Sequence, residues 1–173
     1  VLFRSFSLIE NSTTPLVLDA DALNCVAKQP EILLRKKAPI IITPHPGEMS
    51  RLTGLATPLV NAERERVALD FAQKYGVVTV LKGAGTVIAS PNGKVLVNPT
   101  GNSGMATGGS GDVLAGMTAS ILAQGASAFS SAAAAVYLHG LAGDIAAEKY
   151  GKISMLPTDL INCIPLAYKR CGF

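Results

Sequence analysis

The sequence predicts an α/β fold in which a mainly parallel sheet is covered by helices and carries one antiparallel hairpin. Short apolar runs alternate with helical stretches along the chain. Apolar residues make up 49% of the 173 residues and aromatic residues only 5%, so the core must consist of small aliphatic side chains, which suit strands buried between helices. The length and the lack of a linker predict a single domain over residues 1–173.

In the first half of the chain, the expected helices begin and end at residues typical of helix termini. Asp21 is a candidate N-cap just after the first apolar run, and Asn61 is a candidate N-cap for a later helix. That helix should end at Gly76, since glycine is favoured after a last helical turn. The expected elements here are a strand over 16–19, a helix over 21–27, a helical stretch near 31–37, a strand over 40–43, a helix from 61 to 76 and a strand over 77–81.

A hairpin and a glycine-rich segment separate the third strand from the last helices. Asn92-Gly93 lies between two β-rich runs, over 86–90 and 94–97, which is a strong hairpin signal. Helices are expected over 112–124, 129–149 and about 157–169. The alanine-rich run over 132–147 either packs against a neighbouring subunit, which makes a homo-oligomer the expected assembly, or packs only within the core.

Charge and cysteine content exclude several classes of protein. A net charge of +3, with no basic cluster denser than residues 35–37, indicates no nucleic-acid partner. No apolar run reaches the roughly 18 residues of a membrane span, and residues 1–10 do not resemble a signal peptide. The three cysteines are odd in number and lack metal-ligand spacing, so no disulfide framework or metal site is expected. We therefore expect a cytoplasmic protein.

The richest candidate site is the glycine-rich segment over residues 98–112. Its glycines let a ligand approach the backbone closely, and the next helix begins with free amides at the positive end of its dipole. Together these form an anion hole suited to phosphate. Asp112 is either a stabilising first-turn acid or a base that deprotonates an acceptor hydroxyl. The segment matches neither the Walker pattern nor Gly-x-Gly-x-x-Gly after a strand.

Three further candidates follow predicted strands, where open α/β sheets bind ligands. Lys82 and the glycines after it offer charge and amides to phosphate, although a plain tight turn is the alternative. His45 lies between two prolines that restrict its backbone, and it is either structural or part of a site. Asp19 could line the same site. His139, within an apolar helix, is interpreted as a core or interface residue.

Three segments, in their order along the chain, resemble one family closely. They are Leu18-Asp-Ala-Asp-Ala-Leu-Asn24, Thr43-Pro-His-Pro-Gly-Glu48 and Asn102-Ser-Gly-Met-Ala-Thr-Gly-Gly-Ser-Gly-Asp-Val-Leu-Ala-Gly116. The family is the ADP/ATP-dependent NAD(P)H-hydrate dehydratases of the ribokinase-like superfamily, and the resemblance runs from about residue 15 to about residue 165. The Gly-Gly-x-Gly-Asp signature is shared by many kinases of that superfamily, whereas the Pro-His-Pro-Gly-Glu segment is much more specific.

The resemblance implies a ribokinase-like three-layer fold and a set of site residues. Asp112 is implied as the catalytic residue, and His45, Asn102 and Asp112 as contacts of the hydrated nicotinamide substrate. The residues expected to contact ADP or ATP are Lys82, Gly83, Ala84, Gly85, Thr86, Gly108, Gly109 and Gly111.

The implied reaction phosphorylates the hydroxyl on the hydrated ring of the S-epimer and then eliminates phosphate, which restores NADH or NADPH. Mg²⁺ is expected to offset the phosphate charge, and an NAD(P)H-hydrate epimerase is the expected pathway partner.

Family members usually have a longer N-terminal part, so this domain is expected to be partial and to lack some of the sheet and of the substrate pocket. Two alternatives remain. One is a small-molecule kinase of the same superfamily, against which the Pro-His-Pro-Gly-Glu segment argues. The other is a truncated domain that binds adenylate without turnover. The choice between ADP and ATP stays open, since the resemblance favours ADP only for a bacterial protein.

Overall fold

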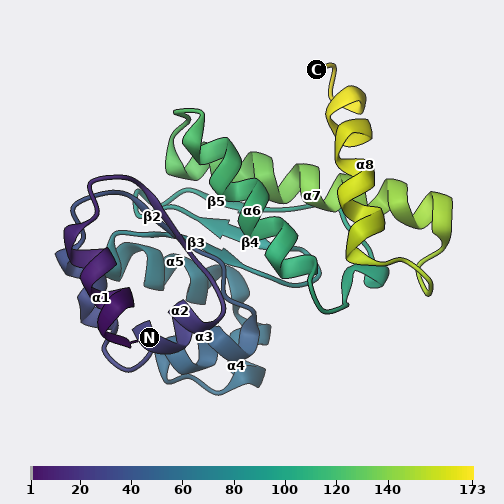
Figure 1. The fold of residues 1–173 in the computed structure, drawn as a ribbon. Helices are drawn as coiled ribbons and strands as arrows, with labels where there is room; N and C mark the ends of the chain where they lie inside the picture. The colour runs from purple at the N-terminus through teal and green to yellow at the C-terminus, as the bar shows by residue number, and fades with distance from the viewer. Residues whose placement is uncertain (1) are drawn as a thin grey trace.

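The computed structural model describes residues 2–173, with side chains from residue 4, as a mixed sheet between two layers of helices (Figure 1). The first three strands are parallel, and the last two add antiparallel pairings to β3 and to each other. The α/β class and the hairpin are thereby confirmed. The strands, each beside the next in the sheet, are β1 (Leu16–Leu18), β2 (Ile40–Ile42), β3 (Val78–Leu81), β4 (Val87–Ala89) and β5 (Val95–Val97).

The two helical layers come from the two halves of the chain, coloured purple to blue and green to yellow in Figure 1. The first layer holds α1 (Leu2–Asn11), α2 (Asp21–Val26), the 3-10 helix η1 (Pro30–Arg35), α3 (Pro46–Thr53), α4 (Thr57–Ala62) and α5 (Arg64–Tyr75). The second holds α6 (Ser110–Ala123), α7 (Ala128–Tyr150) and α8 (Pro157–Arg170), and a short 3-10 helix, η2 (Ser103–Met105), precedes α6.

The sheet is buried on both faces, which explains why its inner strands are continuous apolar runs. Successive side chains of a strand point to opposite faces. In β2, Ile40 and Ile42 pack in the core under the first layer, and Ile41 packs in the core under the second. All three are at most 1% exposed. In β4, Ile88 likewise faces the second layer.

Several helices of the first layer differ from the prediction. Asp21 is the first residue of α2 and caps nothing, because Ala20, at φ 49°, is the N-cap. Asn61 lies inside α4 rather than at a helix start, and the chain bends at Glu63 before α5 begins. Pro58, in the first turn of α4, is the signal that the prediction overlooked. The helices α1 and α3 were not predicted, and the stretch near 31–37 is the 3-10 helix η1.

None of the described helices combines the length and the apolar character that a membrane span requires. The three cysteines are free thiols; Cys25 and Cys163 are buried, and Cys171 is exposed.

Two glycines of α7 allow the loop between β5 and α6 to lie directly on the helix. A Cβ atom on Gly140 would lie 2.1 Å from Oγ1 of Thr100 and 2.8 Å from its carbonyl carbon. One on Gly143 would lie 2.3 Å from Sδ of Met105. The alanine-rich run of α7 also packs inward, and the residues of it at 0% exposure are Ala132, Ala135, Ala142 and Ala146. A homo-oligomer stays a prediction.

Gly140→Ala should lower the free energy of unfolding by roughly 1–3 kcal/mol, because the added methyl group forces the backbone at Thr100 away from α7. The matched control is Gly116→Ala in α6, where nothing lies within 4 Å of an added Cβ. Alanine has the higher helix propensity, so the control should gain about 0.5–1 kcal/mol. Urea unfolding measures both variants, and a Gly140→Ala protein as stable as the control would contradict the tight contact.

Candidate functional site

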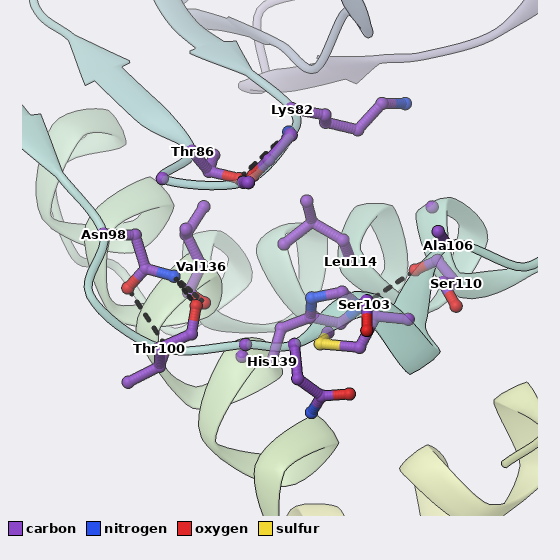
Figure 2. Close-up of a pocket in the computed structure, with 18 of the residues that line it drawn as sticks. Lys82, Thr86, Asn98, Thr100, Ser103, Ala106, Ser110, Leu114, Val136 and His139 are labelled. Atoms are coloured by element: carbon purple, nitrogen blue, oxygen red, sulfur yellow. Dashed lines mark hydrogen bonds between the residues drawn. The ribbon is translucent and has the colours of Figure 1, made fainter. Parts of the chain in front are cut away.

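A cavity of about 530 Å³ lies between the loop after β3 and the second helical layer (Figure 2). That volume is typical of small-molecule sites. Figure 2 shows Lys82 and Thr86 above the cavity and His139 of α7 below it. Four segments line it: the loop over 82–86, the loop over 98–106, the start of α6 and the middle of α7.

The loop over 82–86 is held in shape by its own hydrogen bonds. Oγ1 of Thr86 donates to the carbonyl of Gly83 at 2.9 Å and accepts from the amide of Gly83 at 3.3 Å. The amide of Lys82 donates to the carbonyl of Pro44 at 2.8 Å, which ties the loop to the end of β2. Gly83 and Gly85 have φ values of 146° and 63°, which L side chains rarely adopt. The sequence therefore needs glycine at both positions.

Arg64, at the start of α5 and outside the cavity lining, supports this loop through hydrogen bonds to its backbone. Its Nη2 donates to the carbonyl of Leu81 at 2.8 Å and to that of Gly85 at 3.5 Å, and Nη1 would lie 3.0 Å from a Cβ on Gly83. Burial lowers the pKa of Arg64, but a guanidinium stays charged in proteins. Arg64 was not among the residues predicted from the sequence. The available signal was a cation at a helix start, where the helix dipole favours acids.

The ends of the parallel strands bring together three charged side chains. Nζ of Lys82 lies 2.7 Å from Oδ1 of Asp19 and 3.8 Å from Oε2 of Glu48. These side chains are 19%, 12% and 7% exposed, so the ion pairs are largely shielded from water. Figure 2 shows Lys82 extending along the top of the cavity and not down into it. Lys82 therefore neutralises carboxylates at the sheet edge.

The start of α6 meets this charged cluster at Gly111. A Cβ there would lie 3.5 Å from Nζ of Lys82 and 3.9 Å from Oδ2 of Asp19. The helix begins at Ser110, two residues before the predicted start, and Gly109 is its N-cap, at φ 97°. Asp112 is thus in the first turn, and it is exposed.

His45 has a structural role as the N-cap of α3. Its Nδ1 accepts from the amides of Gly47 and Glu48 at 3.0 and 3.2 Å, and Oε2 of Glu48 accepts from the amide of His45 at 2.8 Å. This reciprocal capping box is worth about 1 kcal/mol in typical helices. Because Nδ1 accepts, the ring proton is on Nε2. The side chain is 51% exposed, so that proton can also be donated to a ligand.

Asn102 lines the cavity, but its side chain also fastens the loop to α7. Nδ2 donates to the carbonyl of Gly143 at 3.0 Å and to Oδ1 of Asp144 at 2.9 Å, and Oδ1 accepts from the amide of Gly104 at 3.0 Å. Oδ2 of Asp144 accepts from the amide of Gly101 at 2.9 Å. Asp144 is therefore a second anchor of this loop, which the sequence analysis did not identify.

His139 is buried, as expected, but it also lines the cavity. It is 9% exposed, and its Nε2 lies 2.9 Å from the carbonyl of Ser110, so Nε2 carries the proton. Burial lowers the pKa of His139 to about 4; the bond to Ser110 opposes this shift and the charge of Lys82 adds to it. The ring is therefore neutral at pH 7. His139 precedes Gly140, where α7 contacts the loop over 98–106. The sequence shows that the two residues are neighbours, but this alone does not predict a binding site.

The structure brings only part of the predicted site into one cavity. Its lining includes the whole loop over 82–86, Asn102 and Gly111. The predicted residues outside that lining are His45, Gly108, Gly109 and Asp112. Among the described residues, no group of three or more His, Cys, Asp or Glu side chains is placed to hold a metal ion.

The chain is similar to known proteins over most of its length. A family model described as NAD(P)H-hydrate dehydratase matches residues 4–166. The bifunctional NAD(P)H-hydrate repair enzyme Nnr of Moorella thermoacetica is 46% identical over 163 residues, which are 94% of this chain and 31% of that protein. The ADP-dependent (S)-NAD(P)H-hydrate dehydratase of Neisseria meningitidis is 44% identical over 146 residues, which are 83% of this chain and 49% of that protein. The chain thus spans about a third of the first relative and about half of the second.

Two solved structures share the fold. The ADP/ATP-dependent NAD(P)H-hydrate dehydratase from Bacillus subtilis, co-crystallized with ATP and Mg²⁺, has a TM-score of 0.85 and 36% identity, covering 94% of this chain and 57% of that one. A ribokinase-like superfamily protein from Enterococcus faecalis has a TM-score of 0.83 and 30% identity, covering 98% of this chain and 58% of that one. The predicted ribokinase-like fold is confirmed.

Arg64→Met should lower the free energy of unfolding by roughly 1–3 kcal/mol, because the buried carbonyl of Leu81 loses a charged donor. The control is Arg66→Met two residues along α5, which removes only an exposed ion pair with Glu63 and should change stability by less than about 1 kcal/mol. Equal effects of the two substitutions in urea unfolding would mean that Arg64 does not support the loop.

The buried His139 should make stability depend on pH. Its pKa falls from 6.5 to about 4 on folding, so the unfolded chain binds the proton more tightly. The titration of His139 therefore leaves the free energy of unfolding unchanged above pH 6.5. As the pH falls from 6.5 toward 4, it lowers that free energy by roughly 3 kcal/mol in all. His139→Gln should remove this share of the decline. The measurement is the difference between the two proteins' unfolding free energies across that range, in which the other titrating groups cancel. A difference that stays constant with pH would refute the assignment.

Proposed function

Because the chain belongs to the NAD(P)H-hydrate dehydratase family, we propose that it dehydrates the S-epimer of NAD(P)H hydrate with ADP or ATP as phosphoryl donor. The hydroxyl oxygen on the hydrated ring takes the phosphoryl group. The bond from the ring carbon to that oxygen then breaks, phosphate leaves, and loss of a proton from the ring restores the double bond. The protein is thus a lyase that uses a kinase fold, and phosphate is a much better leaving group than hydroxide.

The observation that carries the proposal is the single cavity shared by the loop over 82–86 and Gly111. We place the adenine nucleotide there. The first amides of α6, after Gly108 and Gly109, would receive the phosphates, since they lie at the positive end of the helix dipole. The glycine backbone of the 82–86 loop would contact the adenylate part, and Arg64, outside the cavity lining, would support that loop. Lys82 would contribute through its backbone and its charge.

The hydrated nicotinamide would approach from the side of Asp112 and His45, outside the nucleotide cavity. Asp112 is exposed in the first turn of α6, where a carboxylate can take the proton of the acceptor hydroxyl as the phosphoryl group is transferred. Nε2–H of His45 can donate to the substrate while Nδ1 caps α3. Asn102 would act on the substrate mainly by shaping the loop, since its side chain is already bonded to α7.

Mg²⁺ would enter with the nucleotide, as it usually binds substrate phosphates together with one or two carboxylates. It would offset the phosphate charge beside Asp112. The bifunctional repair enzymes among the relatives suggest an NAD(P)H-hydrate epimerase as pathway partner. Free thiols suit a reducing compartment, so a cytoplasmic location is part of the proposal.

Asp112→Asn should reduce turnover by ~10²–10⁴-fold while nucleotide binding is retained or tightened, because asparagine cannot accept the proton and no longer repels phosphate. The assay incubates the protein with ADP or ATP, Mg²⁺ and hydrated NADH, and follows recovery of the reduced-nicotinamide absorbance. The control is Asp70→Asn on the exposed surface of α5, which should keep full activity.

Three outcomes would count against this assignment. A folded Asp112→Asn protein within a few-fold of the parent turnover would mean that Asp112 is only a helix-stabilising acid. Phosphorylation of another small molecule without recovery of absorbance would identify a kinase. Calorimetric binding of ADP without turnover under any condition would identify a nucleotide-binding domain in place of a dehydratase.

A further inference from the structure

His139 presents an unused hydrogen-bonding group to the middle of the nucleotide cavity. Figure 2 places its ring between Ser110 on one side and Val136 and Thr100 on the other. Nε2 is bonded to the carbonyl of Ser110 at 2.9 Å. Among the described groups, which are the side chains of residues 4–173 and the backbone of residues 2–173, none donates a hydrogen bond to Nδ1. The residue is 9% exposed, and it is part of the cavity lining.

The proton on Nε2 decides what Nδ1 can bind. A carbonyl oxygen only accepts, so Nε2 must donate, and in the neutral ring Nδ1 is then an acceptor. Burial and the nearby charge of Lys82 keep the ring neutral at pH 7. Phosphate oxygens at that pH are acceptors too. Nδ1 therefore cannot bind a phosphate oxygen, because both atoms are acceptors. Its partner must carry an O–H or N–H group.

The two ends of the cavity indicate which part of a nucleotide lies over His139. One end is the start of α6, whose free amides suit phosphate. At the other end, Asn98 and Thr100 bond to each other at 3.1 Å and to backbone carbonyls, and Pro99 and Val136 add apolar surface. That end suits the flat face of a base. The sugar connects the two.

We propose that Nδ1 of His139 accepts a hydrogen bond from a ribose hydroxyl of the adenine nucleotide. This inference rests on the proposed nucleotide site and adds a residue to it. The carbonyl of Ser110 makes His139 selective for hydrogen-bond donors, because it holds the ring in the tautomer in which Nδ1 accepts. Since Ser110 is also the first residue of α6, the same bond sets the sugar-binding group at a fixed distance from the phosphate-binding amides.

The test compares binding of ADP, 2′-deoxy-ADP and 3′-deoxy-ADP to the unaltered protein and to two variants by calorimetry. One deoxy analogue should bind about 3- to 10-fold more weakly than ADP to the unaltered protein, the range of a neutral hydrogen bond. His139→Met has no acceptor of this kind and should bind ADP and that analogue about equally. His139→Gln keeps a donor for Ser110 and an acceptor for the sugar, and should restore part of the difference. Tyr137→Phe, on the exposed side of α7, is the control and should behave as the parent.

The outcomes separate this inference from the proposed function. If the unaltered protein binds no ADP, the proposed nucleotide site is wrong, and the role of His139 falls with it. If ADP binds but neither analogue is weaker, or if the deoxy penalty persists in a folded His139→Met protein, the nucleotide site stands and the assignment to His139 is overturned. The melting temperature of each variant without ligand shows whether it folds. The quantity compared is the ratio of the affinities for ADP and for the deoxy analogue within one protein, so a general loss of affinity leaves it unchanged.

Discussion

The site depends on the ion pair between Lys82 and Asp19 at the edge of the sheet. β1 and β3 are both parallel to β2, so their carboxyl ends meet at one edge, and a cation and a carboxylate 63 residues apart come to lie 2.7 Å from each other. An ion pair that is largely buried, as this one is, adds little net stability, but loss of one partner leaves the other charge shielded and unpaired. Glu48 shares the same ammonium. The first turn of α6 can approach this cluster because Gly111 has no side chain.

Around that edge, the walls of the cavity are loops made rigid by backbone contacts. Arg64 bonds to carbonyls at both ends of the 82–86 loop. On the opposite wall, Asn102 and Asp144 fasten the loop to α7, and Gly140 lets the two backbones touch. Such supports reduce the ordering that a ligand must impose on binding, and they are what a preorganised site requires.

The charges of the site are divided along its length. The cation Lys82 is already matched by carboxylates, so phosphates would be held mainly by backbone amides and the helix dipole. The neutral His139 lies between the start of α6 and the apolar end of the cavity, where a charged ring would be unfavourable beside Lys82. Asp112 lies outside the lining of this cavity, and its side chain is exposed in the first turn of α6.

Local patterns in the sequence determined the α/β class, the positions of the strands, the Asn92-Gly93 hairpin and the glycine-rich turn before α6, since each depends on residues close together in the chain. They also determined that the loops after β2 and β3 lie at the same edge of the sheet, because the carboxyl ends of parallel strands meet there. Only the tertiary structure decided that Arg64 supports the loop over 82–86, that Asp144 anchors the opposite loop, and that His139 opens onto the cavity. These roles rest on contacts between segments 17 to 43 residues apart. The pattern of apolar residues within one helix or strand carries no information about such contacts. The hydrogen-bond partners of these side chains depend on how whole helices pack against the sheet.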